Sequence, residues 1–183
     1  MLPVFLDTCV LLRPYLCDTL LSVAEAGVYR PLWSPMVMTE LERNLGRRGL
    51  NEKQIRHRLD QMNGAFPDAL VVGYEALIDQ MVNDPKDRHV LAAAARGGAE
   101  VLVTENLRDF PAQAVHPYNI EVVNQDTFLL DAFDLRPADV LAALRRQVSR
   151  YHREPRTIQS LLAILGGTSS GCTSFSQVCS LAL

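Results

Sequence analysis

Short apolar runs alternate along the chain with segments of helical periodicity, and this alternation restricts the fold more than any other feature. Leu2–Leu6 and Val101–Val103 are continuous apolar runs of strand length, and a polar residue follows each run at once. Such runs are typical of strands that are buried on both faces of a parallel sheet. We therefore predict an α/β fold with a central parallel sheet, in which Val28–Trp33 and Ile120–Val123 supply further strands.

Helical segments separate these strands, and several carry clear start signals. The pair Ser34-Pro35 combines an N-cap residue with a proline at the first helical position, which predicts a helix to about Leu45. The sequence Asp84–Asp87 opens a second helix over Arg88–Arg96, which Gly97-Gly98 closes. Further helices are predicted over Cys17–Ala26, Asn51–Met62, Asp126–Phe133, Ala138–Tyr151 and Arg156–Leu165.

These patterns divide the 183 residues into three predicted segments. Residues 1–134 form the α/β domain, and residues 135–165 form a helical extension because two helical patterns follow each other there without a strand. Residues 166–183 contain no Asp, Glu, Lys or Arg and are rich in Ser, Thr and Gly, which predicts a poorly ordered tail. At this length the chain buries enough surface to fold without disulfides or a structural metal.

The composition also bounds the setting of the protein. No apolar run approaches the ~20 residues that span a bilayer. The apolar amino terminus carries Asp7 and no preceding basic region, so we expect neither a membrane span nor a signal peptide. The four cysteines form no CxxC pair and no zinc-finger spacing with histidines, which favours reduced thiols in a cytoplasmic protein.

Carboxylates and other polar groups follow two of the predicted strands. Asp7 and Thr8 come after the first strand, and Thr104 to Asn106 with Asp109 come after Val101–Val103. In an open parallel sheet, ligands bind outside the carboxyl ends of the strands, so both groups are candidates for a shared site. As alternatives, Asp7 caps the helix that follows it and Asp109 bonds to local backbone groups.

Two predicted helices carry further candidate acids. At about 100° per residue, Asp87 falls within the apolar stripe of its helix, where an unpaired charge is costly, and we favour a ligand role over capping. His89 lies on the opposite side of that helix and is a poor ligand candidate. Glu40 and Glu42 border opposite sides of the apolar stripe of the helix after Pro35, and periodicity alone does not choose between them.

Several carboxylates at one cleft would repel one another, at a cost on the order of 4 kcal/mol for each pair at roughly 4 Å and an effective dielectric near 20. Such a cluster persists when protons are taken up or a cation is bound. Hard oxygen ligands without sulfur or imidazole select Mg²⁺ or Mn²⁺ over zinc or copper. The sequence therefore predicts a divalent cation at the carboxylates.

Four pieces of sequence resemble a known family when they are taken in order. They are VFLDTCVLL at residues 4–12, SPMVMTELERNL at 34–45, NDPKDRHVLAAAARGGAEVLVTENL at 83–107 and RDFP at 108–111. Over Leu2 to Phe133 the chain is similar to PIN-domain ribonucleases, in particular the VapC-like toxins of bacterial toxin–antitoxin pairs. The resemblance implies a three-layer α/β/α sandwich whose acidic residues bind Mg²⁺ or Mn²⁺. It also implies that the protein hydrolyses RNA with the help of this metal.

The resemblance also implies roles for individual residues. Asp7, Glu40 and Asp87 match the acidic positions, which selects Glu40 over Glu42. The position two residues after Thr104 is often Asp in the family and is Asn106 here. We infer that Asp109 compensates as the fourth metal ligand, that Asn106 orients substrate or metal, and that Thr104 bonds an acid or the attacking water.

Arginines supply the charge that RNA binding requires, although the net charge of the chain is −3. We predict RNA contacts from one cluster beside the helix after Pro35 and from a second cluster in the extension; the named candidates are Arg43, Arg47, Arg48, Arg145 and Arg146. Solvated helix faces are the alternative for both clusters. The resemblance implies an antitoxin partner and a homodimer. A catalytically weak PIN-like module that binds RNA or protein is the competing hypothesis for the chain.

Overall fold

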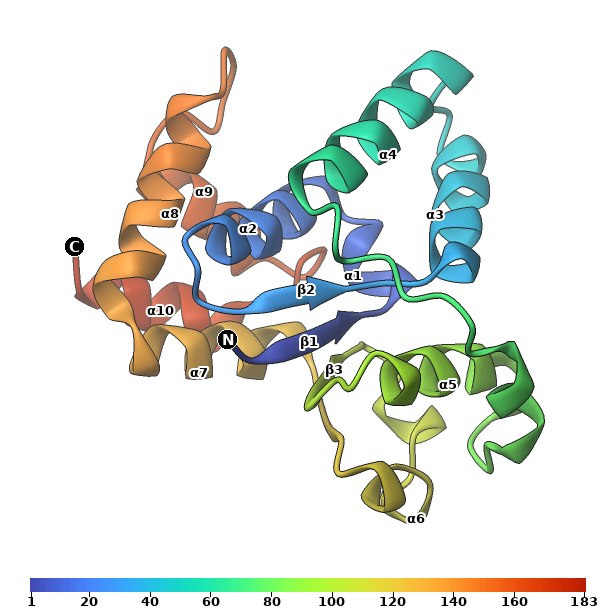
Figure 1. The fold of residues 1–183 in the computed structure, drawn as a ribbon. Coiled ribbons are helices and arrows are strands. Elements are labelled where there is room, and N and C mark those ends of the chain that lie inside the picture. The colour runs from blue at the N-terminus through green and yellow to red at the C-terminus, as the bar shows by residue number, and fades with distance from the viewer. The chain divides into compact units, whose positions relative to one another are not determined.

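The computed structural model describes residues 1–183 as two compact units (Figure 1). The sheet unit comprises Leu2–Leu12 and Arg30–Val123. The helical unit comprises Met1, Arg13–Tyr29 and Asn124–Leu183. No helix in either unit combines the length and the apolar character needed to cross a membrane.

The sheet unit is built on four parallel strands in the order β2-β1-β3-β4. They are β1 (Pro3–Leu6), β2 (Arg30–Leu32), β3 (Val101–Val103) and β4 (Glu121–Val123). From β1 the chain crosses to β2 on one side and later returns to β3 on the other, so the strand order reverses between β1 and β3. Ligands bind at such a switch point in open α/β sheets. The predicted α/β fold with a central parallel sheet is confirmed.

Helices of the sheet unit surround these strands. They are α1 (Thr8–Leu11), α3 (Pro35–Arg47), α4 (Glu52–Ala65), α5 (Arg88–Arg96) and α6 (Ala112–Val115), with the 3-10 helices η1 (Glu75–Gln80), η2 (Pro85–Asp87), η3 (Leu107–Asp109) and η4 (His116–Tyr118). Ser34 caps α3 as predicted, since its hydroxyl accepts the Val37 N–H at 3.2 Å. Asn51 caps α4 as predicted and completes a capping box with Gln54.

The helical unit contains α2 (Pro14–Glu25), α7 (Gln125–Leu135), α8 (Pro137–Ser149), α9 (Ile158–Leu165) and α10 (Thr173–Leu181). Helix α2 packs against α8, and α10 packs against both α7 and α9. Leu144, Leu161 and Phe175 are fully buried among these helices. The helices after Pro137 therefore share one core with α2, rather than forming a separate extension over residues 135–165.

The predicted disordered tail is wrong for residues 173–181, which form α10. Phe175 and Cys179 are fully buried there, and the Asp126 carboxylate accepts the N–H groups of Ser174 at 3.1 Å and Phe175 at 2.8 Å. The buried face of α10 packs against α7 and α9, and its other face is exposed without carrying charge. The segment belongs to the helical unit.

Candidate functional site

Asp7 lies at the carboxyl end of β1, where the register pairs Leu6 with Val103 and so brings Asp7 beside Thr104. The Asp7 carboxylate is buried and accepts the Thr8 N–H at 2.6 Å, the Thr104 hydroxyl at 2.7 Å and the Cys9 thiol at 3.3 Å. Burial raises the pKa of Asp7, and these three hydrogen bonds offset part of that rise. Asp7 is thus both the cap of α1 and a buried acid at the switch point.

Glu40 of α3 faces the same strand end. One oxygen accepts the Thr8 hydroxyl at 2.8 Å, and the other lies 3.1 Å from His89 Nε2. Burial alone would raise the pKa of Glu40, but the contacts with His89 and Thr8 hold it below its ordinary value. Glu42 is exposed on α3, so the structure brings Glu40 to the cluster and leaves Glu42 outside it.

Asp87 lies at the junction between η2 and α5. Its Oδ2 atom is buried and has no hydrogen-bond partner, while its carboxyl group shares a hydrogen bond with Asp109. Burial, the negative charge of Asp7 and the bond with Asp109 raise the pKa of Asp87 to about 7. The capping bond at this helix start comes from Asp84, whose carboxylate accepts the Lys86 N–H at 3.1 Å, whereas the Asp87 side chain makes no capping bond to α5.

Asp109 and Asn106 occupy η3 and the residue before it. Lys86 Nζ lies 3.0 Å from Asp109 Oδ2, and this contact lowers the pKa of Asp109. Asn106 is exposed, and its backbone N–H donates to the Thr104 hydroxyl at 3.1 Å. The structure therefore places Asp109 against Asp87 and leaves the Asn106 side chain on the surface.

The prediction that His89 faces away from the acids is wrong. The prediction measured the angle between Asp87 and His89 as if both lay on one regular α-helix. In the structure Asp87 belongs to the 3-10 helix η2, and α5 begins only at Arg88. Residues His89 to Ala94 are all buried, so α5 has no solvent side at this point. Thr8 was among the predicted candidates, whereas Cys9 and Lys86 were missed. The DTC sequence after β1 was the available signal for Cys9.

Cys9 contributes a protonated thiol to the cluster. Its sulfur donates to Asp7 and accepts the Glu105 N–H at 3.2 Å. Burial and the charge of Asp7 raise the pKa of Cys9 to about 12. The thiol is a hydrogen-bond donor to the carboxylate at neutral pH. None of the four cysteines is in a disulfide, as predicted.

The donor set fits a hard cation in its chemistry, although no three His, Cys, Asp or Glu side chains are grouped so as to hold one ion. Glu40 uses both oxygens on protein groups, whereas Asp87 keeps a buried oxygen unpaired beside the charge of Asp7. Mg²⁺ usually keeps several waters and binds through one or two carboxylates. Both Asp7 oxygens also accept protein hydrogen bonds, so Asp87 is the acid of this cluster that keeps an unpaired buried oxygen.

The predicted RNA-binding arginines fall in both units. Arg43, Arg47 and Arg48 lie on the exposed part of α3 and at its end, and the charge of Arg43 helps to lower the pKa of Glu40. Arg145 and Arg146 are exposed on α8 of the helical unit. Of the α3 arginines, Arg43 is the one whose charge acts on a predicted acid, Glu40.

Comparison with known proteins agrees with the fold. The family described as "PIN domain" matches residues 3–108, and the family described as "VapC50 C-terminal domain" matches residues 125–179. The chain belongs to the PIN-domain family. A protein of Mycobacterium tuberculosis named "Putative ribonuclease VapC50" is 48% identical over 98 residues, which is 54% of this chain. The match spans 58% of the length of that relative. No solved structure gives a significant match.

Proposed function

We propose that this chain is a metal-dependent endoribonuclease and the toxin of a toxin–antitoxin pair. The observation that carries the proposal is the Asp7–Asp87 pair at the switch point between β1 and β3, with one Asp87 oxygen buried and unpaired. Membership of the PIN-domain family and the ribonuclease named among its relatives support the same reaction.

Asp7 and Asp87 are the residues that would hold Mg²⁺ or Mn²⁺. A bound divalent ion supplies a water of lowered pKa and stabilises the charge that develops on the phosphate. Thr104 and Thr8 fix Asp7, so its oxygens keep their positions. Glu40 and Asp109 are ionised neighbours of this pair and are suited to accept a hydrogen bond from the attacking water or to join the ligand set.

RNA binding in this proposal depends on the arginines of α3. Arg43, Arg47 and Arg48 would contact phosphates, and Arg145 and Arg146 of α8 would contact a further part of the substrate. Contacts of this kind weaken as the salt concentration rises, because binding releases counterions from the RNA. The proposal includes a homodimer and an antitoxin whose segment occupies the acidic site, as the resemblance to VapC-like toxins implies.

A catalytically weak module that binds RNA or protein is the second candidate. Two observations favour it: Asn106 replaces an acid that is frequent in the family, and no three ligands are grouped for one ion. This candidate differs from the first in its response to divalent ions, since RNA affinity would then be unchanged by a chelator.

The test is an RNA-cleavage assay of the purified protein with Mg²⁺ or Mn²⁺, using structured and single-stranded RNA as substrates. Asp7→Asn and Asp87→Asn are expected to abolish cleavage, and the exposed Asp79→Asn serves as the matched control that keeps wild-type activity. Cleavage by both site variants at the wild-type rate would refute the assignment. RNA binding without cleavage by the wild type, insensitive to chelator, would support the second candidate.

A further inference from the structure

The helical unit contains a cavity of about 490 Å³ between the start of α2 and the loop that follows α8. Aromatic and charged side chains line much of it. They include Tyr15, Asp18, Arg150, Tyr151, His152 and Arg153. None of these residues belongs to the acidic site.

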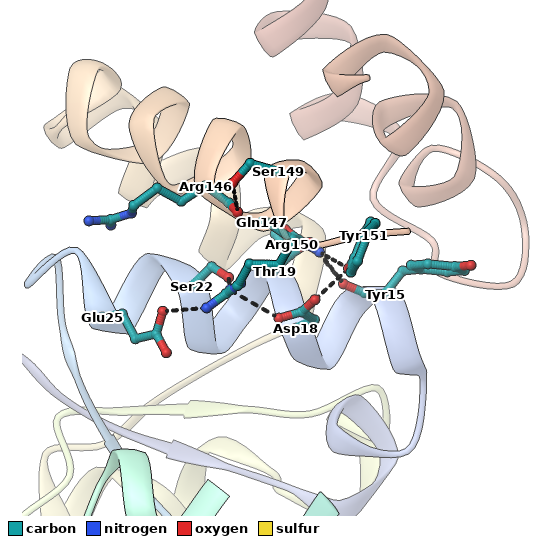
Figure 2. Close-up of polar contacts among 10 residues, drawn as sticks. All are labelled: Tyr15, Asp18, Thr19, Ser22, Glu25, Arg146, Gln147, Ser149, Arg150 and Tyr151. Carbon is teal, nitrogen blue, oxygen red and sulfur yellow. Dashed lines mark hydrogen bonds and ion pairs between the residues drawn. The ribbon is translucent and has the colours of Figure 1, made fainter. Parts of the chain in front are cut away.

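A buried hydrogen-bond network fixes Tyr151 in the wall of this cavity (Figure 2). The Tyr151 hydroxyl donates to Asp18 and accepts from Gln147 Nε2, the latter at 2.8 Å. Gln147 is fully buried and accepts the Thr19 hydroxyl at 2.9 Å. The oxygen and the nitrogen of the Gln147 amide and the Tyr151 hydroxyl all have hydrogen-bond partners. These bonds hold the ring of Tyr151 in one orientation before any ligand binds.

Tyr15 forms an edge-on pair with Tyr151. The ring centroids are 5.9 Å apart and the planes meet at 74°, so the rings do not stack face to face. Each ring therefore keeps at least one face that the other does not cover. The Tyr15 hydroxyl makes a single long bond, 3.4 Å to the Glu154 carbonyl. Tyr15 is half-buried, and its ring can pack against a planar group.

Some charged side chains around the cavity have partners of opposite charge, and others do not. Asp18 is matched by the Tyr151 hydroxyl and by Arg150 at 3.4 Å, and Arg150 also reaches Glu25 at 3.1 Å (Figure 2). The Glu154 carboxylate accepts the Arg156 N–H at 2.9 Å. Arg153 is exposed and has no carboxylate partner, so its positive charge is available to an anion.

We propose that this cavity binds one unpaired nucleotide of an RNA strand, with the base against the ring of Tyr15 and the phosphate on Arg153. Aromatic rings beside an unpaired cation are the combination that single-stranded nucleic acid requires, because every base offers a planar face and every link a negative charge. The inference rests on the proposed ribonuclease function for its ligand class, but its residues are separate from the acids that hydrolyse. An acidic peptide would use Arg153 without needing the rings.

The test uses a fluorescent single-stranded RNA and the Asp7→Asn chain, in which cleavage is expected to be abolished. Tyr15→Leu is expected to raise the Kd about tenfold, the loss typical for one base stacked on an aromatic ring. Tyr15→Phe keeps the ring and is expected to bind like the parent chain. Arg153→Gln is expected to reduce the slope of log Kd against log salt by about 1. The half-buried Tyr118→Leu and the exposed Arg30→Gln are the matched controls.

A second readout locates the contact. RNA carrying 4-thiouridine is irradiated on the parent chain, and the adducts are mapped by mass spectrometry. Adducts at Tyr15 or Tyr151, lost in Tyr15→Leu while the melting temperature is kept, support the proposal. An unchanged Kd in Tyr15→Leu overturns it, including the case in which Arg153→Gln weakens RNA binding, because the RNA would then be held by charge without base stacking. If the wild type cleaves RNA but Tyr15→Leu leaves the Kd unchanged, only the nucleotide-binding cavity is refuted. If Tyr15→Leu raises the Kd but the wild type does not cleave RNA, only the proposed ribonuclease activity is refuted.

Discussion

His89 Nε2 of α5 lies 3.1 Å from Glu40 Oε1 of α3, and both side chains border the end of β1. His89 is 4% exposed, whereas the Glu40 side chain is 30% exposed, so His89 contacts Glu40 from the interior of the unit. Thr8 holds the other Glu40 oxygen at 2.8 Å. The two contacts together fix the direction of an acid that would otherwise turn toward solvent.

Replacement of His89 by alanine is expected to lower the single-turnover rate of RNA cleavage by about tenfold, the lower end of the range for groups that orient metal-site carboxylates. The Kd for RNA should stay within about twofold, because His89 is buried and does not face the solvent-exposed arginines. The exposed His116→Ala is the control. An unchanged rate in His89→Ala would show that Glu40 needs no positioning.

Thr104→Val is expected to lower the free energy of unfolding by about 1–2 kcal/mol, because the buried Asp7 carboxylate loses its shortest side-chain hydrogen bond. Thr104→Ser retains the hydroxyl and should unfold like the wild type. Denaturant titration of both variants measures the difference. Equal stability of the valine and serine variants would mean that the hydroxyl does not stabilise Asp7.

Stability without divalent ions should fall as the pH rises from about 4 to about 8. Asp87 has an ordinary pKa of 3.8 and one of about 7 in the folded chain, so the folded state binds the extra proton across this interval. Its contribution is complete below pH 4 and lost as the pH passes 7. Asp87→Asn removes this titration and should flatten the profile, whereas Asp79→Asn should not. Parallel profiles for wild type and Asp87→Asn, measured in EDTA, would contradict the raised pKa.

Phe175→Ala is expected to destabilise the helical unit by about 3–5 kcal/mol, since the ring is fully buried where α10 packs. Leu181 is 89% exposed on the same helix, so Leu181→Ala should change stability by less than about 0.5 kcal/mol. Thermal unfolding followed by circular dichroism compares them. Two variants with the same melting temperature as wild type would indicate that residues 173–181 do not pack.

The strands and most helices could be predicted because their signals are local. Val101–Val103 is a strand with the predicted bounds, and Ser34 caps the helix that begins at Pro35. Asp7 and Thr104 were predicted to meet because parallel strands end at one edge of a sheet. These inferences needed only apolar runs, capping residues and the direction of the strands.

Other features depend on tertiary contacts that no local pattern records. The 3-10 turn over Pro85–Asp87 reoriented the start of α5, so an angle measured along one regular helix misplaced His89. Helix α10 has no charged residues, and its order comes from burial against α7 and α9 rather than from helix propensity. Helical periodicity alone left Glu40 and Glu42 equivalent; the family resemblance selected Glu40, and its bond with Thr8 of a different element places it at the cluster.

Calorimetric titration of the chain with Mn²⁺ tests the central claim most directly, because it asks whether Asp7 and Asp87 together hold a divalent ion. Saturable binding is expected at pH 7.5, and it should be lost in Asp87→Asn and kept in Asp79→Asn. Absence of saturable binding to the folded wild type, or equal binding to Asp87→Asn, would contradict it.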